Sequence, residues 1–139
     1  MQVAFTTRDG KHVNAHFGWA NQIDIYEVTP EGYRFCKTLT FGGNLEADGN
    51  EDKLVPKLQA LADVTLIYVA AIGSSAAARL INRRITPIKV QSEEEPIESL
   101  LQRLVSTLHN PPPWLRKVLL AERARKAEAP NPSTSPAEV

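Results

Sequence analysis

Hydrophobic and polar residues alternate at the start of the chain, as they do in strands that bury one face. Residues 2 to 7 place Val3 and Phe5 on the apolar face. A polar stretch with two glycines follows from Arg8 to Gly18, and this composition is typical of a loop. We therefore expect the chain to begin with a strand and a long loop.

Two more alternating segments, residues 22 to 29 and 33 to 41, are separated by a turn sequence that begins with Pro30 and ends with Gly32. This arrangement predicts a hairpin, and with the first strand it makes a meander of three antiparallel strands. Simple alternation places four large apolar residues on one face of the second arm: Tyr33, Phe35, Leu39 and Phe41. It places Cys36 on the opposite, more polar face.

The hydrophobic period changes after residue 50. Residues 51 to 62 carry apolar side chains at helical spacing, with Pro56 near the expected start. Residues 64 to 72 are almost continuously apolar, which predicts a central strand covered on both faces. A helix that opens at Gly73, Ser74 and Ser75 and a short strand at 86 to 90 complete a strand-helix-strand unit, whose two strands should be parallel.

Ser92 and Glu95 have the spacing of a capping box and predict the start of a last core helix. Its apolar positions form one stripe: Ile97, Leu100, Leu101, Leu104, Val105 and Leu108. Three consecutive prolines follow Asn110, then a basic segment compatible with a helix, and finally a stretch rich in Pro, Ser and Ala. We expect an α/β domain over residues 1 to 109 and a proline-led basic tail over 110 to 139, disordered at its end.

These elements predict an α/β fold with a five-stranded mixed sheet flanked by helices. The order of three antiparallel strands followed by a parallel strand-helix-strand unit resembles the ribonuclease H-like fold. A length of 139 residues with 42% hydrophobic residues suits one core. Acidic and basic residues balance at 16 each, so no overall positive field favours nucleic acid or an anionic membrane. Without an apolar leader or a membrane-length run, the sequence predicts a cytoplasmic protein.

The loop from Asp9 to Gly18 is the strongest candidate site, because binding groups collect on loops held by a rigid scaffold. His16 offers a neutral imidazole, the usual nitrogen ligand for iron and other transition metals, and Gly18 would let a bulky guest approach the backbone. The alternative is that His16 caps a turn or bonds locally. His12 is a weaker candidate for a metal ligand, and Cys36 becomes one only through the family resemblance given below. Because Cys36 is the only cysteine, the chain cannot enclose a site of several thiolates by itself.

The junction at Gly73, Ser74 and Ser75 could receive an anion on its backbone N–H groups. A capped helix that packs through small residues explains the same sequence equally well. The junction lacks the glycine and lysine pattern of a phosphate loop, which disfavours nucleotide binding. Neither a Ser/His/Asp arrangement nor a set of paired carboxylates is recognisable, so nuclease or other catalysis is disfavoured.

Several spaced motifs together resemble the dinitrogenase iron-molybdenum cofactor biosynthesis family. They are the Asp9-Gly10 to His16-Phe17-Gly18 loop, the Ala71-Ile72-Gly73 junction with Ala76 to Arg79, the strand Pro87 to Val90 and the exit Asn110 to Leu115. The resemblance spans about residues 1 to 118. Two positions depart from the family pattern: Ser74-Ser75 replace a common Gly-Pro, and Val64 or a neighbour stands where a cysteine is often found.

The resemblance implies a ribonuclease H-like fold, no catalysis, and transient binding of an iron-sulfur cofactor precursor or of the iron-molybdenum cofactor. It implies exchange with a NifB-type donor, a NifEN-type scaffold and apo-dinitrogenase. His16 is the position carried over as a cluster contact. The expected contact set adds seven residues: Phe17, Gly18, Arg8, Lys11, Gly73, Ser74 and Ser75. One weak imidazole contact suits a carrier, because a carrier must release its cargo. The alternative is an interaction chaperone for apo-dinitrogenase that docks through Pro111 to Trp114 and the basic segment.

Overall fold

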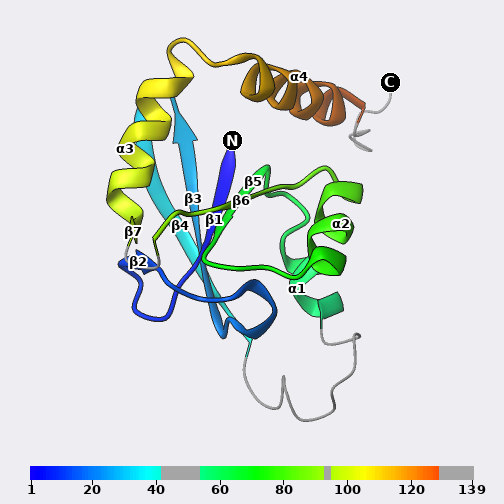
Figure 1. Ribbon diagram of the computed structural model, residues 1–139. Helices are drawn as coiled ribbons and strands as arrows, with labels where there is room; N and C mark the ends of the chain where they lie inside the picture. Colours follow the sequence, from blue (N-terminus) through cyan, green and yellow to red (C-terminus); the bar gives the residue numbers. More distant parts are fainter. Residues whose placement is uncertain (42–53, 93–94, 129–139) are drawn as a thin grey trace. The chain divides into compact units, whose positions relative to one another are not determined.

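The computed structural model describes residues 1–41, 54–92 and 95–128, with side chains described as far as residue 124 (Figure 1). The chain divides into two compact units, Met1–Leu108 and His109–Val139. The first contains the sheet and its helices, and the described part of the second is helix α4 (Pro113–Glu128) with the residues that lead into it. The expected disorder of residues 129 to 139 lies outside the described residues.

Five strands form one mixed sheet in the order β4-β3-β1-β5-β6. The central strand β1 (Gln2–Thr6) pairs antiparallel with β3 (Gln22–Thr29), which pairs antiparallel with β4 (Gly32–Thr40). On its other side β1 runs parallel to β5 (Leu66–Val69), which runs parallel to β6 (Thr86–Lys89). The predicted meander and the predicted parallel unit are therefore both confirmed.

Helices cover both faces of this sheet (Figure 1). Helices α1 (Leu54–Ala60) and α2 (Ser74–Asn82) pack on one face, where their buried side chains join those of the sheet in the larger core cluster. Pro56 occupies the first turn of α1, where a missing backbone donor costs nothing. On the other face lies α3 (Ile97–Leu108), above β3 and β4.

The face beneath α3 has an aromatic core. Phe5 stacks on Tyr68 with ring centroids 5.2 Å apart and meets the edge of Tyr26 at 5.6 Å. Five of the six residues in the predicted apolar stripe of α3 are buried, which confirms the stripe at these positions: Ile97, Leu100, Leu101, Leu104 and Leu108. Val105 is only half-buried.

The predicted faces of β4 are wrong beyond Phe35. A bulge shifts the pairing register, because Ile25 pairs with Lys37 while the next residue, Tyr26, pairs with Phe35. Cys36 is the extra residue, and it packs with Leu39 and Phe41 against the core cluster of α1 and α2. Cys36 therefore lies against apolar surface and not on a polar face.

The predicted capping box at Ser92 and Glu95 is also wrong, since α3 begins at Ile97. Glu95 belongs to a short strand, β7 (Glu95–Pro96), which pairs antiparallel with β2 (His12–Val13). The Glu95 carboxylate accepts a 2.7 Å hydrogen bond from Arg103, one and a half turns into the helix. The pairing of β7 with β2, a contact between distant parts of the chain, thus takes the place of the capping box that the local sequence predicts.

Candidate functional site

The segment between β1 and β3 is more ordered than a free loop. It contains β2 and the 3-10 turn η1 (Phe17–Trp19). The Ala15 carbonyl accepts hydrogen bonds from Thr6 Oγ1 at 2.8 Å and from the Ala70 N–H at 3.2 Å. The Phe17 N–H donates to the Ala71 carbonyl at 2.8 Å. Residues 15 to 17 are thus fixed beside the carboxyl end of β5.

His16 is the N-cap of η1, and its Nδ1 atom accepts a 3.0 Å hydrogen bond from the Gly18 N–H. Its ring lies 5.3 Å from the Trp19 ring, with the planes tilted by 34°. Trp19 is 71% exposed, which is unusual for so large an apolar side chain. The hydrogen bond from Gly18 to Nδ1 shows that His16 caps the turn locally, which was the alternative interpretation of this residue.

Lys57 supports the same turn from below. It is completely buried in α1, and its ammonium donates to the carbonyls of Phe17 and Gly18, both at 2.9 Å. Two aromatic rings, those of Phe17 and Phe41, lie 5.7 Å from the nitrogen. A lysine from a distant helix therefore holds the backbone directly after His16.

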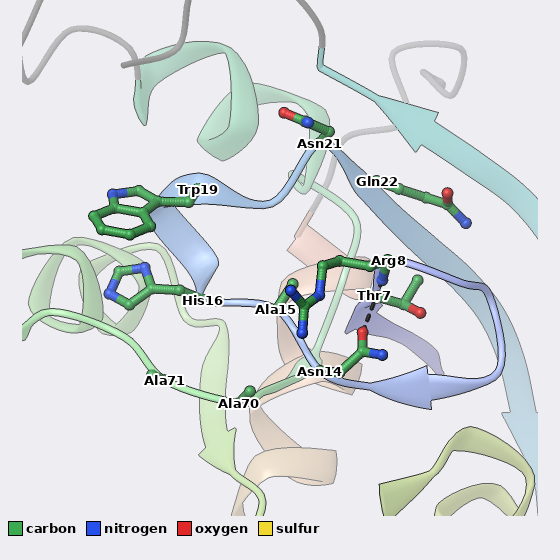
Figure 2. A pocket seen from close by; sticks show the side chains of 10 residues that line it. All are labelled: Thr7, Arg8, Asn14, Ala15, His16, Trp19, Asn21, Gln22, Ala70 and Ala71. Carbon is green, nitrogen blue, oxygen red and sulfur yellow. Dashed lines mark hydrogen bonds between the residues drawn. The ribbon is translucent and has the colours of Figure 1, made fainter. Parts of the chain in front are cut away.

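A pocket of about 550 Å³ opens above this turn, within the size range of small-molecule sites. Figure 2 shows the rings of His16 and Trp19 side by side at one end, while the Arg8 side chain extends over Ala15. The amides of Asn14 and Gln22 lie beyond Arg8 (Figure 2). The described lining consists of Thr7, Arg8, Asn14, Ala15, His16, Trp19, Asn21, Gln22, Ala70 and Ala71.

The lining gives the pocket two chemical ends. One offers an imidazole and an indole, and the other offers the primary amides of Asn14 and Gln22. Arg8 is the one charged side chain among the described lining residues. The pocket can therefore receive a ligand that carries negative charge and accepts hydrogen bonds.

Two of the expected contacts, His16 and Arg8, line this pocket. Phe17 and Gly18 instead lie beneath it: Phe17 is a core residue, and Gly18 is buried. A Cβ atom on Gly18 would lie 3.4 Å from Cε1 of His16. The Cβ position of this glycine thus faces the His16 ring.

Lys11 and His12 belong to a different pocket, of about 450 Å³, beside the start of α3. The His12 ring bonds the Asp9 carboxylate at 2.9 Å. That bond, followed by those from the backbone N–H groups of Lys11 and His12, holds the pKa of Asp9 below its usual range. The structure therefore does not bring His12 and His16 together at one site.

The described lining of the His16 pocket does not include Cys36 or the residues Gly73 to Ser75. Cys36 packs at the core, as described above. Gly73 is the N-cap of α2 without a side-chain cap, and Ser74 and Ser75 are exposed in the first turn. Across the described residues, no three His, Cys, Asp or Glu side chains are grouped as a metal site would require.

Sequence reasoning missed Trp19 and Lys57, and it left Asn14 out of the expected contact set. Trp19 lies three residues after His16, and a tryptophan so close to a candidate ligand is a signal that could have been used. Asn14 lies within the candidate loop itself, where its Oδ1 accepts from the Arg8 N–H at 2.8 Å. Lys57 gives no such signal, because a lysine between apolar helix positions ordinarily points to solvent.

The helices within the described ranges all fall short of the combined length and hydrophobicity that a membrane span requires.

Comparison with known proteins relates the chain to nitrogen-fixation proteins. The chain is 48% identical to Protein NifX of Herbaspirillum seropedicae over 120 residues, which is 86% of this chain and 82% of that protein. It is 38% identical to Protein NifX of Azotobacter vinelandii over 124 residues, 88% of this chain and 77% of that protein. The crystal structure of PH0822 has the same fold, with a TM-score of 0.58 at 14% identity over 76% of this chain and 91% of its own.

A profile of one protein family, described as dinitrogenase iron-molybdenum cofactor, matches residues 1–107. These residues include the sheet, helices α1 and α2, α3 except for its last residue, and all the described residues that line the His16 pocket. The expected resemblance is thereby confirmed, and the chain belongs to the dinitrogenase iron-molybdenum cofactor family, with NifX proteins among its relatives.

Proposed function

We propose that this protein is a non-enzymatic carrier that transiently binds an iron-sulfur precursor of the iron-molybdenum cofactor, or the cofactor itself, and passes it on. Membership of the family connects the chain with biosynthesis of this cofactor. The single observation that carries the proposal is the open pocket beside His16, with one imidazole, one indole and one guanidinium at its surface. We infer that the cargo binds there.

The hydrogen bonding of His16 supports a weak contact. Because Nδ1 accepts the Gly18 N–H, the neutral ring carries its proton on Nε2. In this form Nε2 can donate a hydrogen bond to a cluster sulfide. For Nε2 to bind iron, the proton must move to Nδ1 and the bond from Gly18 must break. That cost weakens ligation and so favours release of the cargo.

The remaining lining supports an anionic cargo. Arg8 supplies a positive charge, and the amides of Asn14 and Gln22 supply N–H donors. Both kinds of group suit a cluster with negative charge and accepting atoms at its surface. We leave Lys11, His12 and Cys36 out of the proposed contact set, because each lies away from this lining.

The proposal is tested by anaerobic titration of the protein with the isolated iron-sulfur precursor, monitored by the visible absorbance of the cluster. We expect near-stoichiometric binding to the wild type and at least about tenfold weaker binding to His16→Ala, as for the loss of one polar contact.

His12→Ala is the matched control, since it removes the same ring four residues away and outside the pocket. Cys36→Ala tests the thiol in the same way. Both should bind like the wild type. Unchanged affinity in His16→Ala would remove His16 from the mechanism, and a wild type that does not bind would remove the carrier function.

A second function, an interaction chaperone for apo-dinitrogenase, is favoured by the surface of the second unit. Trp114 is 49% exposed and Leu120 is 57% exposed on α4. The basic residues of this helix, Arg116, Lys117, Arg123, Arg125 and Lys126, outnumber its acidic residues Glu122 and Glu128. Co-purification with apo-dinitrogenase that is lost when the chain ends at residue 109, with no cluster binding by either form, would favour this function.

Several finer assignments belong to the same proposal. We propose that residues 1 to 109 hold the cargo and that residues 110 to 139 contact a protein partner. The partners would be a NifB-type donor, a NifEN-type scaffold and apo-dinitrogenase. The strand order β4-β3-β1-β5-β6 supports the ribonuclease H-like classification. Exchange with such partners would take place in the cytoplasm.

A further inference from the structure

We propose that Lys57 is a positioning residue for His16, and that it acts through the single peptide group between Phe17 and Gly18. The carbonyl of this peptide accepts from the Lys57 ammonium at 2.9 Å, and its N–H donates to Nδ1 of His16 at 3.0 Å. Lys57 and the imidazole are therefore connected through one rigid unit. The importance of this link for cargo binding rests on the proposed carrier function, whereas its effect on the ring does not.

The geometry of the peptide group explains why the link transmits position. A trans peptide is planar, and its C=O and N–H bonds point in opposite directions. Fixing the Phe17 oxygen towards Lys57 on one side thus aims the Gly18 hydrogen towards His16 on the other. The second bond, from Lys57 to the Gly18 carbonyl at 2.9 Å, fixes the following peptide as well.

The charge of Lys57 strengthens the link. A cation at the carbonyl oxygen polarises the peptide and makes its N–H a better donor, and buried hydrogen bonds in a chain reinforce one another. Nδ1 of His16 is consequently held as an acceptor, and the ring proton is held on Nε2. Lys57 thus selects both the orientation of the ring and its tautomer.

Packing alone does not account for a lysine at this position. Lys57 is completely buried, and the rings of Phe17 and Phe41 lie 5.7 Å from its nitrogen. Burial of an ammonium is costly, and an apolar side chain of similar length would fill the same space at lower cost. What an apolar side chain cannot supply is the pair of bonds to the carbonyls that follow His16.

The test compares the wild type with Lys57→Met, which is unbranched and one atom shorter than lysine and removes its donors and charge. The readout is a long-range ¹H–¹⁵N correlation spectrum of the histidine rings without cargo, in which His16 is assigned from His16→Ala. In the wild type we expect the neutral ring as the Nε2–H tautomer alone. In Lys57→Met we expect a measurable Nδ1–H population and a broadened His16 signal. An unchanged His16 ring in folded Lys57→Met overturns the proposal.

Loss of stability is separated from loss of positioning by Leu104→Ala, which opens a cavity in α3 on the other face of the sheet. This control should leave the tautomer unchanged, and a similar shift in its spectrum would overturn the proposal. If Lys57→Met does not fold, Lys57→Gln serves as the variant, since it loses the charge and holds its amide N–H groups on a side chain one atom shorter than that of lysine. A ring in Lys57→Gln identical to that of the wild type also overturns the proposal.

Cargo titration then connects the ring to function. We expect Lys57→Met to bind the iron-sulfur precursor about tenfold more weakly, as for the loss of one hydrogen bond, and Leu104→Ala to bind like the wild type. If the wild type itself does not bind, the carrier function fails while the spectrum still decides the role of Lys57. If Lys57→Met binds the precursor with wild-type affinity although the tautomer of His16 has shifted, Lys57 has no role in cargo binding.

Discussion

Individual residues in the segment from Arg8 to Trp19 divide into those that line the His16 pocket and those that hold the backbone in place. His16, Trp19 and Arg8 line the pocket, whereas Phe17 is buried below it. Asp9 belongs to the second group, because its carboxylate accepts from the backbone N–H groups of Lys11 at 2.8 Å and His12 at 2.9 Å. Both groups are needed for a site on a connecting segment, since the contacts are useful only if the backbone is fixed.

The role of Asp9 predicts a particular pH dependence of stability. Its pKa lies below the ordinary value of 3.8, chiefly because of the bond to His12. The carboxylate therefore favours the folded state above pH 3.8, and this contribution is lost as the pH falls through the lower, folded-state pKa. We expect Asp9→Asn to lower the melting temperature near neutral pH, with a difference from the wild type that shrinks below pH 3.8.

Melting curves across this pH range provide the measurement. Asp63→Asn is a suitable control, since Asp63 is an exposed acid in the turn after α1. A difference between Asp9→Asn and the wild type that stays constant down to strongly acidic pH would contradict the assigned role of the carboxylate.

At the scale of elements, the local hydrophobic and turn patterns predicted helices and strands correctly where one face of the element is buried against a single neighbouring element. The apolar stripe of α3 follows the helical period, and the hairpin β3-β4 follows its turn sequence, so both were predictable. The bulge at Cys36 was not predictable from alternation, because one extra residue exchanges the faces of everything beyond it. The start of α3 was missed because the pairing of Glu95 and Pro96 with β2 involves residues more than 80 positions away.

The apolar stripe of α3 predicts that truncating two neighbouring side chains lowers the free energy of unfolding by different amounts. Leu104 is 4% exposed, whereas Val105 is only half-buried. Leu104→Ala should lower the free energy of unfolding by about 2 to 5 kcal/mol, the range for large-to-small core substitutions. Val105→Ala should lower it by a clearly smaller amount. Urea denaturation of both variants tests this difference, and equal losses would show that the stripe is not the core face of the helix.

At the scale of the whole molecule, the division into two units separates the proposed tasks. The family profile ends at residue 107, close to the boundary between Leu108 and His109. All described residues that line the His16 pocket belong to the first unit. The second unit carries the exposed Trp114 and an excess of basic residues. Cargo binding and partner binding should consequently be separable by shortening the chain.

A chain shortened to residues 1 to 109 is expected to keep the wild-type affinity for the iron-sulfur precursor within about threefold, since it retains the whole described lining. The measurement is the anaerobic titration described above, with the full chain as reference. Circular dichroism of the shortened chain first establishes that it is folded. A folded fragment with strongly reduced affinity would show that residues after 109 contribute to the cargo site.

The sequence by itself determined the order of the five strands of the main sheet and of the helices between them, and the segment that we propose as the site. Both depend on local patterns: hydrophobic period, turn residues, and a histidine between two glycine positions. Only the tertiary structure decided which residues share the pocket. It separated His12 from His16, buried Phe17, and brought Lys57 to a carbonyl 40 residues away. Contacts across such separations depend on how the helices cover the sheet, and they cannot be predicted from the local period of hydrophobic residues.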